Sequence, residues 1–238
     1  MASARAYSPR MALFDPIFEA LDRAHVRYVV VGGVAVVLHG HARLTADLDL
    51  AVDLAAEPAR RVIEALTNIG LKPAAPVDPL GFADTETRTG WIAERAMRVF
   101  TMRDPDDPLR QVDLFVEEPI PFEELWARSE PVALGGLTVR IASIPDLVQT
   151  KHLAGRPLDT EDIARLEEIR ELRERGMAER TASGSTPTDD AGERQRRPRL
   201  EEVLLLTSPA QRFAWLEEAI AFARRAGALP AASGRSSP

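Results

Sequence analysis

The segment 29-VVVGGVAVVLHGHARLTADLDLAVD-53 decides the fold of this chain. Its opening valines belong to residues 27–32, a stretch typical of a buried β-strand, and the two glycines that follow them indicate a tight turn into a short helix. Residues 47–53 then alternate between apolar residues and aspartates, which predicts a second strand with one buried and one polar face. The aspartates raise a question, because carboxylates on one strand face repel each other and add little to folding.

The polar face of this second strand carries Asp47 and Asp49. Side chains two residues apart on a strand point the same way and lie about 7 Å apart. A third carboxylate, Asp113, lies in the alternating stretch 111–117 and points away from that strand's apolar face. If the two strands are neighbours, the three carboxylates converge and need a cation between them, and hard oxygen ligands are what Mg²⁺ prefers. We therefore predict a site for two Mg²⁺ ions, which could activate a hydroxyl and stabilise a leaving pyrophosphate.

Both features also have a purely structural interpretation. An isolated D-x-D is most often a strand with one solvated face, on which carboxylates only aid solubility. Here a glycine turn and a short helix precede the strand, and a second strand supplies a third Asp, which favours a functional site. Gly32 and Gly33 could form a tight turn that needs positive φ, or they could let the backbone approach a phosphate beneath the N–H groups of a helix.

The remaining periodicity predicts an α/β (α+β) fold, with a small mixed β-sheet flanked by helices and a helical C-terminal region. We expect strands at residues 97–103 and 111–117 and a shorter β-pair around Gly135-Gly136. We expect helices at 16–25, at 57–69, from Ser143 to near Gly155, and after Asp159, the last with Ile163, Leu166, Ile169 and Leu172 facing inward.

Composition divides the chain into three parts. Residues 1–178 should form the main domain with its C-terminal helices. Residues 179–199 lack an apolar pattern and are rich in Ser, Thr, Gly, Pro and charge, which predicts a flexible linker. Residues 200–238 should hold one more helix, at 208–226, and a tail. This helix has a capping-box start and an apolar stripe of Phe213, Leu216 and Ile220, through which we expect it to dock on the main domain.

Overall composition excludes several classes of protein. The 238 residues include no cysteine, which rules out disulfides, zinc–thiolate sites and a Cys nucleophile and fits a reducing cytoplasm. No apolar run is long enough for a membrane span, so we expect a cytoplasmic protein with no membrane partner. The net charge of −7 argues against a general attraction to nucleic acid, and any contact with RNA would need a local basic face.

The pattern G-G-x-A-x(4)-G-x-x-R-x-T-x-D-x-D, from Gly32 to Asp49, resembles the nucleotidyltransferase fold of the DNA polymerase β type. It is most similar to the bacterial branch related to AbiEii, the toxin of abortive-infection and type IV toxin–antitoxin systems. The resemblance covers about residues 16–172. It implies a Mg²⁺-dependent enzyme that takes a nucleoside monophosphate from a nucleoside triphosphate (NTP), ATP among the candidates, and transfers it to an acceptor hydroxyl.

The resemblance also implies roles for individual residues. Asp47, Asp49 and Asp113 would be metal ligands and catalytic residues, and Gly32 and Gly33 would seat the phosphates. Many relatives have Ser where this chain has Gly33, so phosphate binding would rely on backbone N–H groups and on Arg43 or Thr45, both of which could equally be structural. In the later segment 151–166, Lys151 would be a further catalytic residue near the triphosphate, where it would offset phosphate charge, and Asp159 or Asp162 would lie near the site. Three-residue spacing makes helix capping an equal alternative for these two aspartates.

The acceptor is not determined by the sequence. One hypothesis is a toxin-like enzyme that modifies RNA, such as a tRNA end, with a cognate antitoxin as partner. A second is nucleotidylation of a protein or of a small molecule such as an aminoglycoside. A third is a nucleotidyltransferase-like scaffold that binds a nucleotide or a partner without catalysis. The intact set of three aspartates favours the enzymes, and the acidic net charge disfavours RNA.

Overall fold

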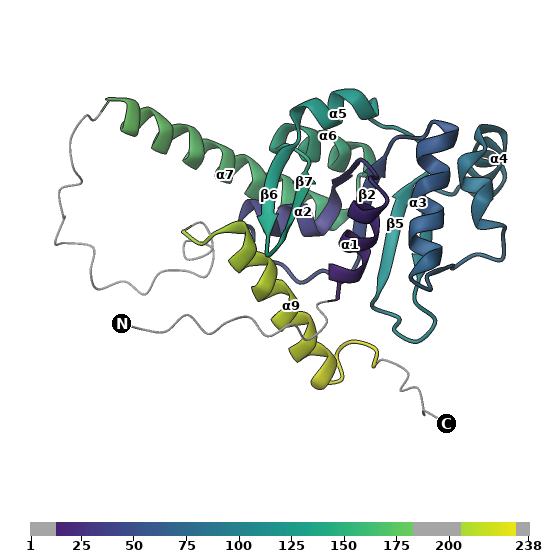
Figure 1. The fold of residues 1–238 in the computed structure, drawn as a ribbon. Helices are drawn as coiled ribbons and strands as arrows, with labels where there is room; N and C mark the ends of the chain where they lie inside the picture. The colour runs from purple at the N-terminus through teal and green to yellow at the C-terminus, as the bar shows by residue number, and fades with distance from the viewer. Residues whose placement is uncertain (1–12, 183–205, 232–238) are drawn as a thin grey trace.

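The computed structural model describes residues 13–182 and 206–231, and it confirms the predicted fold class (Figure 1). A seven-stranded mixed sheet has the order β3-β4-β5-β2-β1-β7-β6. Its strands are β1 (Tyr28–Val30), β2 (Leu48–Val52), β3 (Lys72–Pro73), β4 (Val99–Arg103), β5 (Gln111–Phe115), β6 (Glu130–Leu134) and β7 (Leu137–Ile141).

Helices flank this sheet and follow it along the chain (Figure 1). They are α1 (Asp15–Arg23), α2 (Gly32–His39), α3 (Ala56–Asn68), the 3₁₀ helix η1 (Pro79–Ala83), α4 (Thr85–Arg95), α5 (Phe122–Arg128), α6 (Ile144–Ala154), α7 (Pro157–Ala182) and α9 (Pro209–Arg225).

Strand pairing places the segment that decides the fold at the centre of the sheet. Strand β1 runs antiparallel to β2 and parallel to β7, while β2 runs parallel to β5. Strand β4 is antiparallel to both β5 and β3, so β3 forms one edge of the sheet and the β6–β7 hairpin forms the other. The condition set for convergence of the carboxylates, that residues 47–53 and 111–117 form neighbouring strands, is therefore met.

The two faces of the sheet differ in polarity. On one face, Phe100 of β4 is fully buried, with the ring of Trp91 stacked on it at 5.2 Å and the ring of Phe82 at 5.5 Å. Helix α4 and η1 therefore cover this face, whose buried side chains are Leu48, Leu50, Phe100, Met102, Val112 and Leu114. On the opposite face, Asp49 and Asp113 are only half-buried.

Four elements were not predicted from the sequence: β3, η1, α4 and α5. Helix α4, with the sequence TETRTGWIAER, buries only Arg88 and Trp91 and so carries almost no apolar stripe. It is instead started by a side-chain cap, because Asp84 accepts a hydrogen bond from the N–H of Thr87 at 2.7 Å. Helix α5 has seven residues, which is too short for periodicity to reveal.

Helix α7 corrects two expectations. It begins at Pro157, before Asp159, because proline suits the first turn of a helix. Leu166 and Ile169 are buried as predicted and Ile163 is half-buried, but the side chain of Leu172 is 39% exposed, so its predicted inward position is wrong. The helix projects beyond the body of the protein (Figure 1), and Leu172 is the residue of the predicted apolar stripe nearest its far end.

Helix α7 also reaches Ala182, so residues 179–182 are helical, while the rest of the proposed linker lies outside the described residues, as does the tail from residue 232. Beyond that gap, α9 starts with the predicted capping box of Ser208 and Gln211. Its stripe packs on the body as expected, since Phe213, Leu216 and Ile220 are at most 5% exposed.

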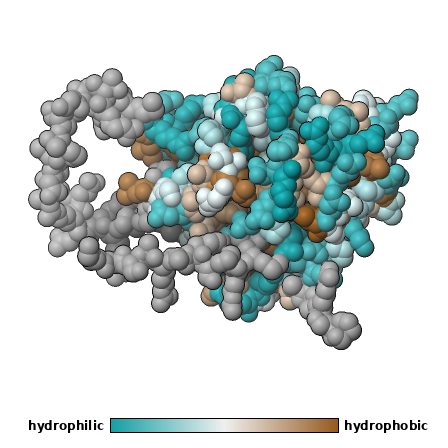
Figure 2. Space-filling model, in the orientation of Figure 1, coloured by the Kyte–Doolittle hydropathy of each residue, from teal (hydrophilic) through white to brown (hydrophobic). Residues whose placement is uncertain are grey.

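Two further contacts fix α9. The ring of Phe213 lies 6.1 Å from the rings of Phe14 and Phe18, and Arg212 donates a hydrogen bond to the carbonyl oxygen of Leu38 at 2.6 Å. The face shown in Figure 2 is mostly hydrophilic, with hydrophobic residues in small separate groups. Within the described residues, no helix is both long and apolar enough to cross a membrane.

Candidate active site

Three carboxylates lie on the polar face of the sheet. Strands β2 and β5 are paired so that Asp49 stands directly beside Asp113, and the antiparallel pairing of β4 places Thr101 beside Asp113 in turn. Asp47, one residue before β2, lies next to Gln111 at the start of β5, whose side-chain N–H donates to Asp47 Oδ1 at 2.5 Å. We call Asp47, Asp49 and Asp113 the carboxylate row.

The carboxylate row holds poorly compensated negative charge. Burial raises the pKa of Asp49 to about 7, and the charges of Asp113 and Asp47 add to that rise. The guanidinium of Arg156 and the backbone N–H of Gly33 act in the opposite direction but do not cancel it. Burial also raises the pKa of Asp113, against the effect of the Thr101 hydroxyl, which donates to Asp113 Oδ1 at 2.5 Å.

The glycine turn is shaped by this row. Gly32 has a φ of +61°, and a Cβ atom on it would lie 1.9 Å from Oδ2 of Asp49. A Cβ atom on Gly33 would lie 2.6 Å from the Thr45 hydroxyl. Asp49 thus fills the space beside the start of α2 and accepts a hydrogen bond from Gly33. Steric demand alone explains both glycines, and it leaves the N-terminus of a buried helix facing the carboxylates.

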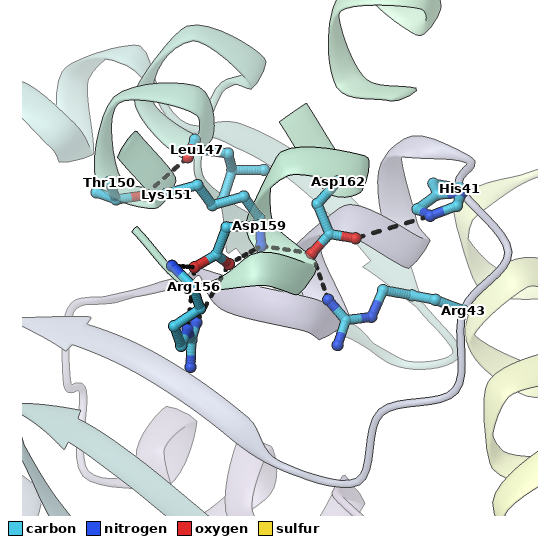
Figure 3. A network of polar contacts seen from close by, with 8 residues as sticks. All are labelled: His41, Arg43, Leu147, Thr150, Lys151, Arg156, Asp159 and Asp162. Atoms are coloured by element: carbon cyan, nitrogen blue, oxygen red, sulfur yellow. Dashed lines mark hydrogen bonds and ion pairs between the residues drawn. The ribbon is translucent and has the colours of Figure 1, made fainter. Parts of the chain in front are cut away.

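A second charged cluster lies at the corner between α6 and α7 (Figure 3). The ammonium of Lys151, a residue only 4% exposed, donates to Asp162 Oδ2 at 2.6 Å and to Asp159 Oδ1 at 3.2 Å. Arg43 from the loop before β2 also donates to Asp162 Oδ2. On the outer side, Arg156 Nε donates to Asp159 Oδ2 at 3.0 Å. We call Lys151, Asp159, Asp162, Arg43 and Arg156 the corner cluster.

The contacts of the corner cluster show whether Asp159 and Asp162 cap helix α7 or take part in the site. Asp159 does cap α7, since its Oδ2 accepts the backbone N–H of Arg156 at 3.1 Å, but its other oxygen pairs with Lys151. Asp162 lies in the second turn of α7, beyond the capping position, and it pairs with Lys151 and Arg43 while His41 Nε2 lies 3.7 Å from its Oδ1. Burial raises the pKa of Asp159, yet the hydrogen bonds from Arg156 and Lys151 together outweigh burial and leave that pKa below its usual value.

The predicted site residues therefore fall into two groups. Asp47, Asp49, Asp113, Gly32 and Gly33 lie together at the carboxylate row, with Thr45 against Gly33. Lys151 and Arg43 lie in the corner cluster, where both are engaged with Asp162. Contact between Lys151 and a triphosphate stays a prediction.

Sequence reasoning missed three residues of this region. The side chain of Arg156 is 71% exposed, is held by Asp159, and lies close enough to Asp49 to influence its pKa, so it connects the two groups. Thr101 and Gln111 hold Asp113 and Asp47. Gln111 could have been found, because it stands two residues before Asp113 and so shares its face.

The row suits Mg²⁺ in its chemistry more than in its present arrangement. Among residues 13–182 and 206–231, no three His, Cys, Asp or Glu side chains are gathered into a ready-made metal site. Asp47 and Asp113 are instead turned toward Gln111 and Thr101. All three donors are carboxylates, and a divalent cation would offset the repulsion that, after burial, raises the pKa of Asp49. The donor set therefore fits Mg²⁺, provided that two hydrogen bonds are exchanged for metal bonds.

A scan against models of protein families places this site in a known context. Residues 11–201 match the family described as "Nucleotidyltransferase of unknown function (DUF6036)". The chain belongs to this family. The match contains both the carboxylate row and the corner cluster and ends before α9. It agrees with the resemblance to nucleotidyltransferases, and it does not identify the AbiEii branch. A search of curated proteins found no match.

Proposed function

We propose that this nucleotidyltransferase transfers a nucleoside monophosphate from an NTP to an acceptor hydroxyl in a Mg²⁺-dependent reaction. The observation that carries the proposal is the register of Asp49 beside Asp113, at the N-terminus of α2. A half-buried pair of like charges costs stability in a protein without a ligand. Binding of a cation and a triphosphate would explain why the chain keeps this pair.

In the proposed reaction, the acceptor oxygen forms a bond to the α-phosphorus. The bond from that phosphorus to the oxygen bridging to the β-phosphate breaks, and pyrophosphate leaves with the bonding electrons. The hydroxyl proton passes to the Asp113 carboxylate and from there to water. Mg²⁺ held by Asp47, Asp49 and Asp113 would activate the hydroxyl and offset the charge of the leaving group.

The other residues of the site would bind and orient. The N–H groups at the start of α2 would face the phosphates, with Gly32 and Gly33 keeping side chains out of the way. Arg156 is the exposed cation next to Asp49, so it is placed to contact the triphosphate. Lys151 would act as a positioning residue, because it anchors Asp159, which in turn holds Arg156.

For the acceptor we propose RNA, in a toxin–antitoxin setting like that of the AbiEii branch, with a cognate antitoxin as partner. The experiment is incubation with each α-³²P-labelled NTP, Mg²⁺, and either total RNA or lysate protein. We expect label in RNA with the parent chain and none with Asp113→Asn. Label in protein would redirect the acceptor, and no label in any fraction with any NTP would refute the proposal.

A further inference from the structure

A pair of cations lies at the edge of the polar sheet face, outside the roles assigned above. Lys72 of β3 and Arg103 of β4 are register partners in the antiparallel pairing, so their side chains point to the same side. The next residue pair, Pro73 with Met102, points the other way, and Met102 is fully buried among the apolar side chains. Lys72 and Arg103 therefore share the face of the carboxylate row.

The position of the pair follows from the pairing of four strands. Arg103 is paired with Gln111, and Gln111 binds Asp47, so one line of side chains runs Lys72, Arg103, Gln111, Asp47. The neighbouring line runs Thr101, Asp113, Asp49. Diagonal neighbours on a sheet lie about 7–8 Å apart, which is the separation of Arg103 from Asp113. With strands about 4.8 Å apart, Lys72 lies about 12 Å from Asp113.

Neither cation is balanced by a carboxylate. Both side chains are exposed, and within the described residues neither makes an ion pair or a side-chain hydrogen bond. Like charges directly opposite on paired strands destabilise a sheet. An edge lysine does protect against edge-to-edge pairing, but that function explains Lys72 and leaves Arg103 without a role. Two adjacent uncompensated cations beside an acidic site are suited to an anionic partner.

We propose that Lys72 and Arg103 bind the phosphodiester backbone of a single-stranded nucleic-acid acceptor, whose terminal hydroxyl lies at Asp113. The proposal rests on the proposed nucleotide transfer, and it specifies where the acceptor strand runs: from Asp113 across β4 to the β3 edge. It also supplies the local basic face that an acidic chain needs for such a partner. Acceptor phosphates then lie on the side of Asp113 away from Asp49 and Arg156.

The test is fluorescence anisotropy with a labelled 12-nucleotide single-stranded RNA of mixed sequence, and with DNA of the same sequence, at several salt concentrations. The variants are Lys72→Gln/Arg103→Gln and, as a control of equal charge change, Arg60→Gln/Arg95→Gln on α3 and α4. A third variant, Lys72→Arg/Arg103→Lys, keeps both charges. Comparison of the RNA with the DNA shows whether binding at Lys72 and Arg103 requires ribose or also accepts deoxyribose.

We expect removal of the two cations to weaken binding at least about tenfold at low salt and to reduce the slope of log K against log salt by about 1.4, since each phosphate contact contributes about 0.7. The charge-preserving variant and the control should bind like the parent. Binding of Mg²⁺–NTP, measured by thermal shift, should be unchanged in every variant. Equal affinity and slope in the charge-removal variant and the control, or no binding by the parent, would overturn the inference.

Because binding is measured without turnover, the two proposals can fail separately. A parent chain that binds the strand through these cations yet transfers no nucleotide would refute the proposed function and keep the nucleic-acid face. A parent chain that transfers nucleotide but loses no RNA affinity on charge removal would refute the face alone.

Discussion

The carboxylate row and the corner cluster both gather aspartates, but only the corner cluster gathers matching cations. Asp159 and Asp162 are buried around Lys151, with Arg43 sharing Oδ2 of Asp162 and Arg156 on Oδ2 of Asp159. The carboxylate row has hydrogen bonds from Thr101 and Gln111, which are neutral, and the charge of Arg156 lowers the pKa of Asp49 without cancelling the rise. The pKa of Asp159 is accordingly lowered and that of Asp49 raised.

From this difference we infer that the charges of the corner cluster stabilise the fold, whereas those of the carboxylate row serve to bind a ligand. In the corner cluster, each carboxylate accepts hydrogen bonds from cations of the chain itself. In the row, the chain provides too little positive charge, and the missing part is what Mg²⁺ would supply. Arg156 connects both groups, since it donates a hydrogen bond to Asp159 and interacts electrostatically with Asp49.

The largest expected effect separates activity from stability at the row. Asp49→Asn should lower nucleotide transfer at least about a thousandfold, equivalent to about 4 kcal/mol of transition-state stabilisation, because the metal loses a charged ligand. The folded protein should be as stable as the parent or more so, since Asn can still accept the hydrogen bond from Gly33. Transfer of labelled NTP and thermal unfolding, with and without Mg²⁺–NTP, measure the two effects.

Leu48→Asn is the matched control on the buried face of the same strand. It should cost several kcal/mol of stability, because it loses packing and buries a polar group. An Asp49→Asn protein that is destabilised but still transfers nucleotide would return the row to a structural role.

At the corner cluster the expectation is reversed. Lys151→Met should cost about 3–5 kcal/mol of unfolding free energy, because it leaves two buried carboxylates without their shared cation. Urea unfolding measures the loss, and Lys72→Met, at an exposed lysine, should change stability by less than about 0.5 kcal/mol. If Lys151→Met folds with normal stability and only raises KM for NTP, then Lys151 contacts the substrate and the positioning role is wrong.

Much of the row could be predicted from the sequence because local alternation encodes it. The period of two in residues 47–53 and 111–117 puts Asp47, Asp49 and Asp113 on one face, and the pairing of β2 with β5 completes the row. The glycine turn was also visible, although the close approach of Asp49 to Gly32, which explains it, is a contact between distant residues.

The corner cluster was visible only in part, because its contacts join segments far apart in the sequence. Arg43 meets Asp162 across 119 positions, and no local pattern records that pair. Arg103 and Lys72 were missed for a related reason. Strand β3 has two residues, too few for alternation, so the register that sets the two cations side by side appears only in the sheet.

The dependence of stability on pH should have opposite signs in the two groups. The folded-state pKa of Asp49, about 7, lies above its ordinary 3.8, so its contribution to stability is present at low pH and is lost as pH rises from about 4 to 7. The pKa of Asp159 is lowered, so its contribution is present above about pH 4 and is lost on acidification.

Urea unfolding of the parent and of Asp49→Asn between pH 4 and 8 isolates the contribution of Asp49 to the pH dependence of the unfolding free energy. The stability advantage of the variant should be near zero at pH 4 and grow to as much as about 4 kcal/mol at pH 8, at about 1.4 kcal/mol per pKa unit. Saturating Mg²⁺ should reduce that advantage, since the metal binds the parent's ionised form. A constant difference in stability at every pH would show that the surroundings of Asp49 do not raise its pKa.

The smallest expected effect concerns a neutral partner of the row. The hydroxyl of Thr101 donates to Asp113, and this bond favours the ionised carboxylate against burial and the charge of Asp47. Thr101→Val keeps the shape and removes the donor, so the pKa of Asp113 should rise. A hydrogen bond to a charged group contributes about 1.5–3 kcal/mol, so losing this donor should be measurable as an upward change in the Asp113 pKa. Carbon-13 NMR titration of the carboxyl groups in Mg²⁺-free protein measures this rise.

Thr89→Val, at an exposed hydroxyl on α4 that donates to a backbone carbonyl, is the control and should leave the pKa of Asp113 unchanged. An unchanged or lower Asp113 pKa in Thr101→Val would mean that water replaces the hydroxyl, and that the row is less closed to solvent than its burial suggests.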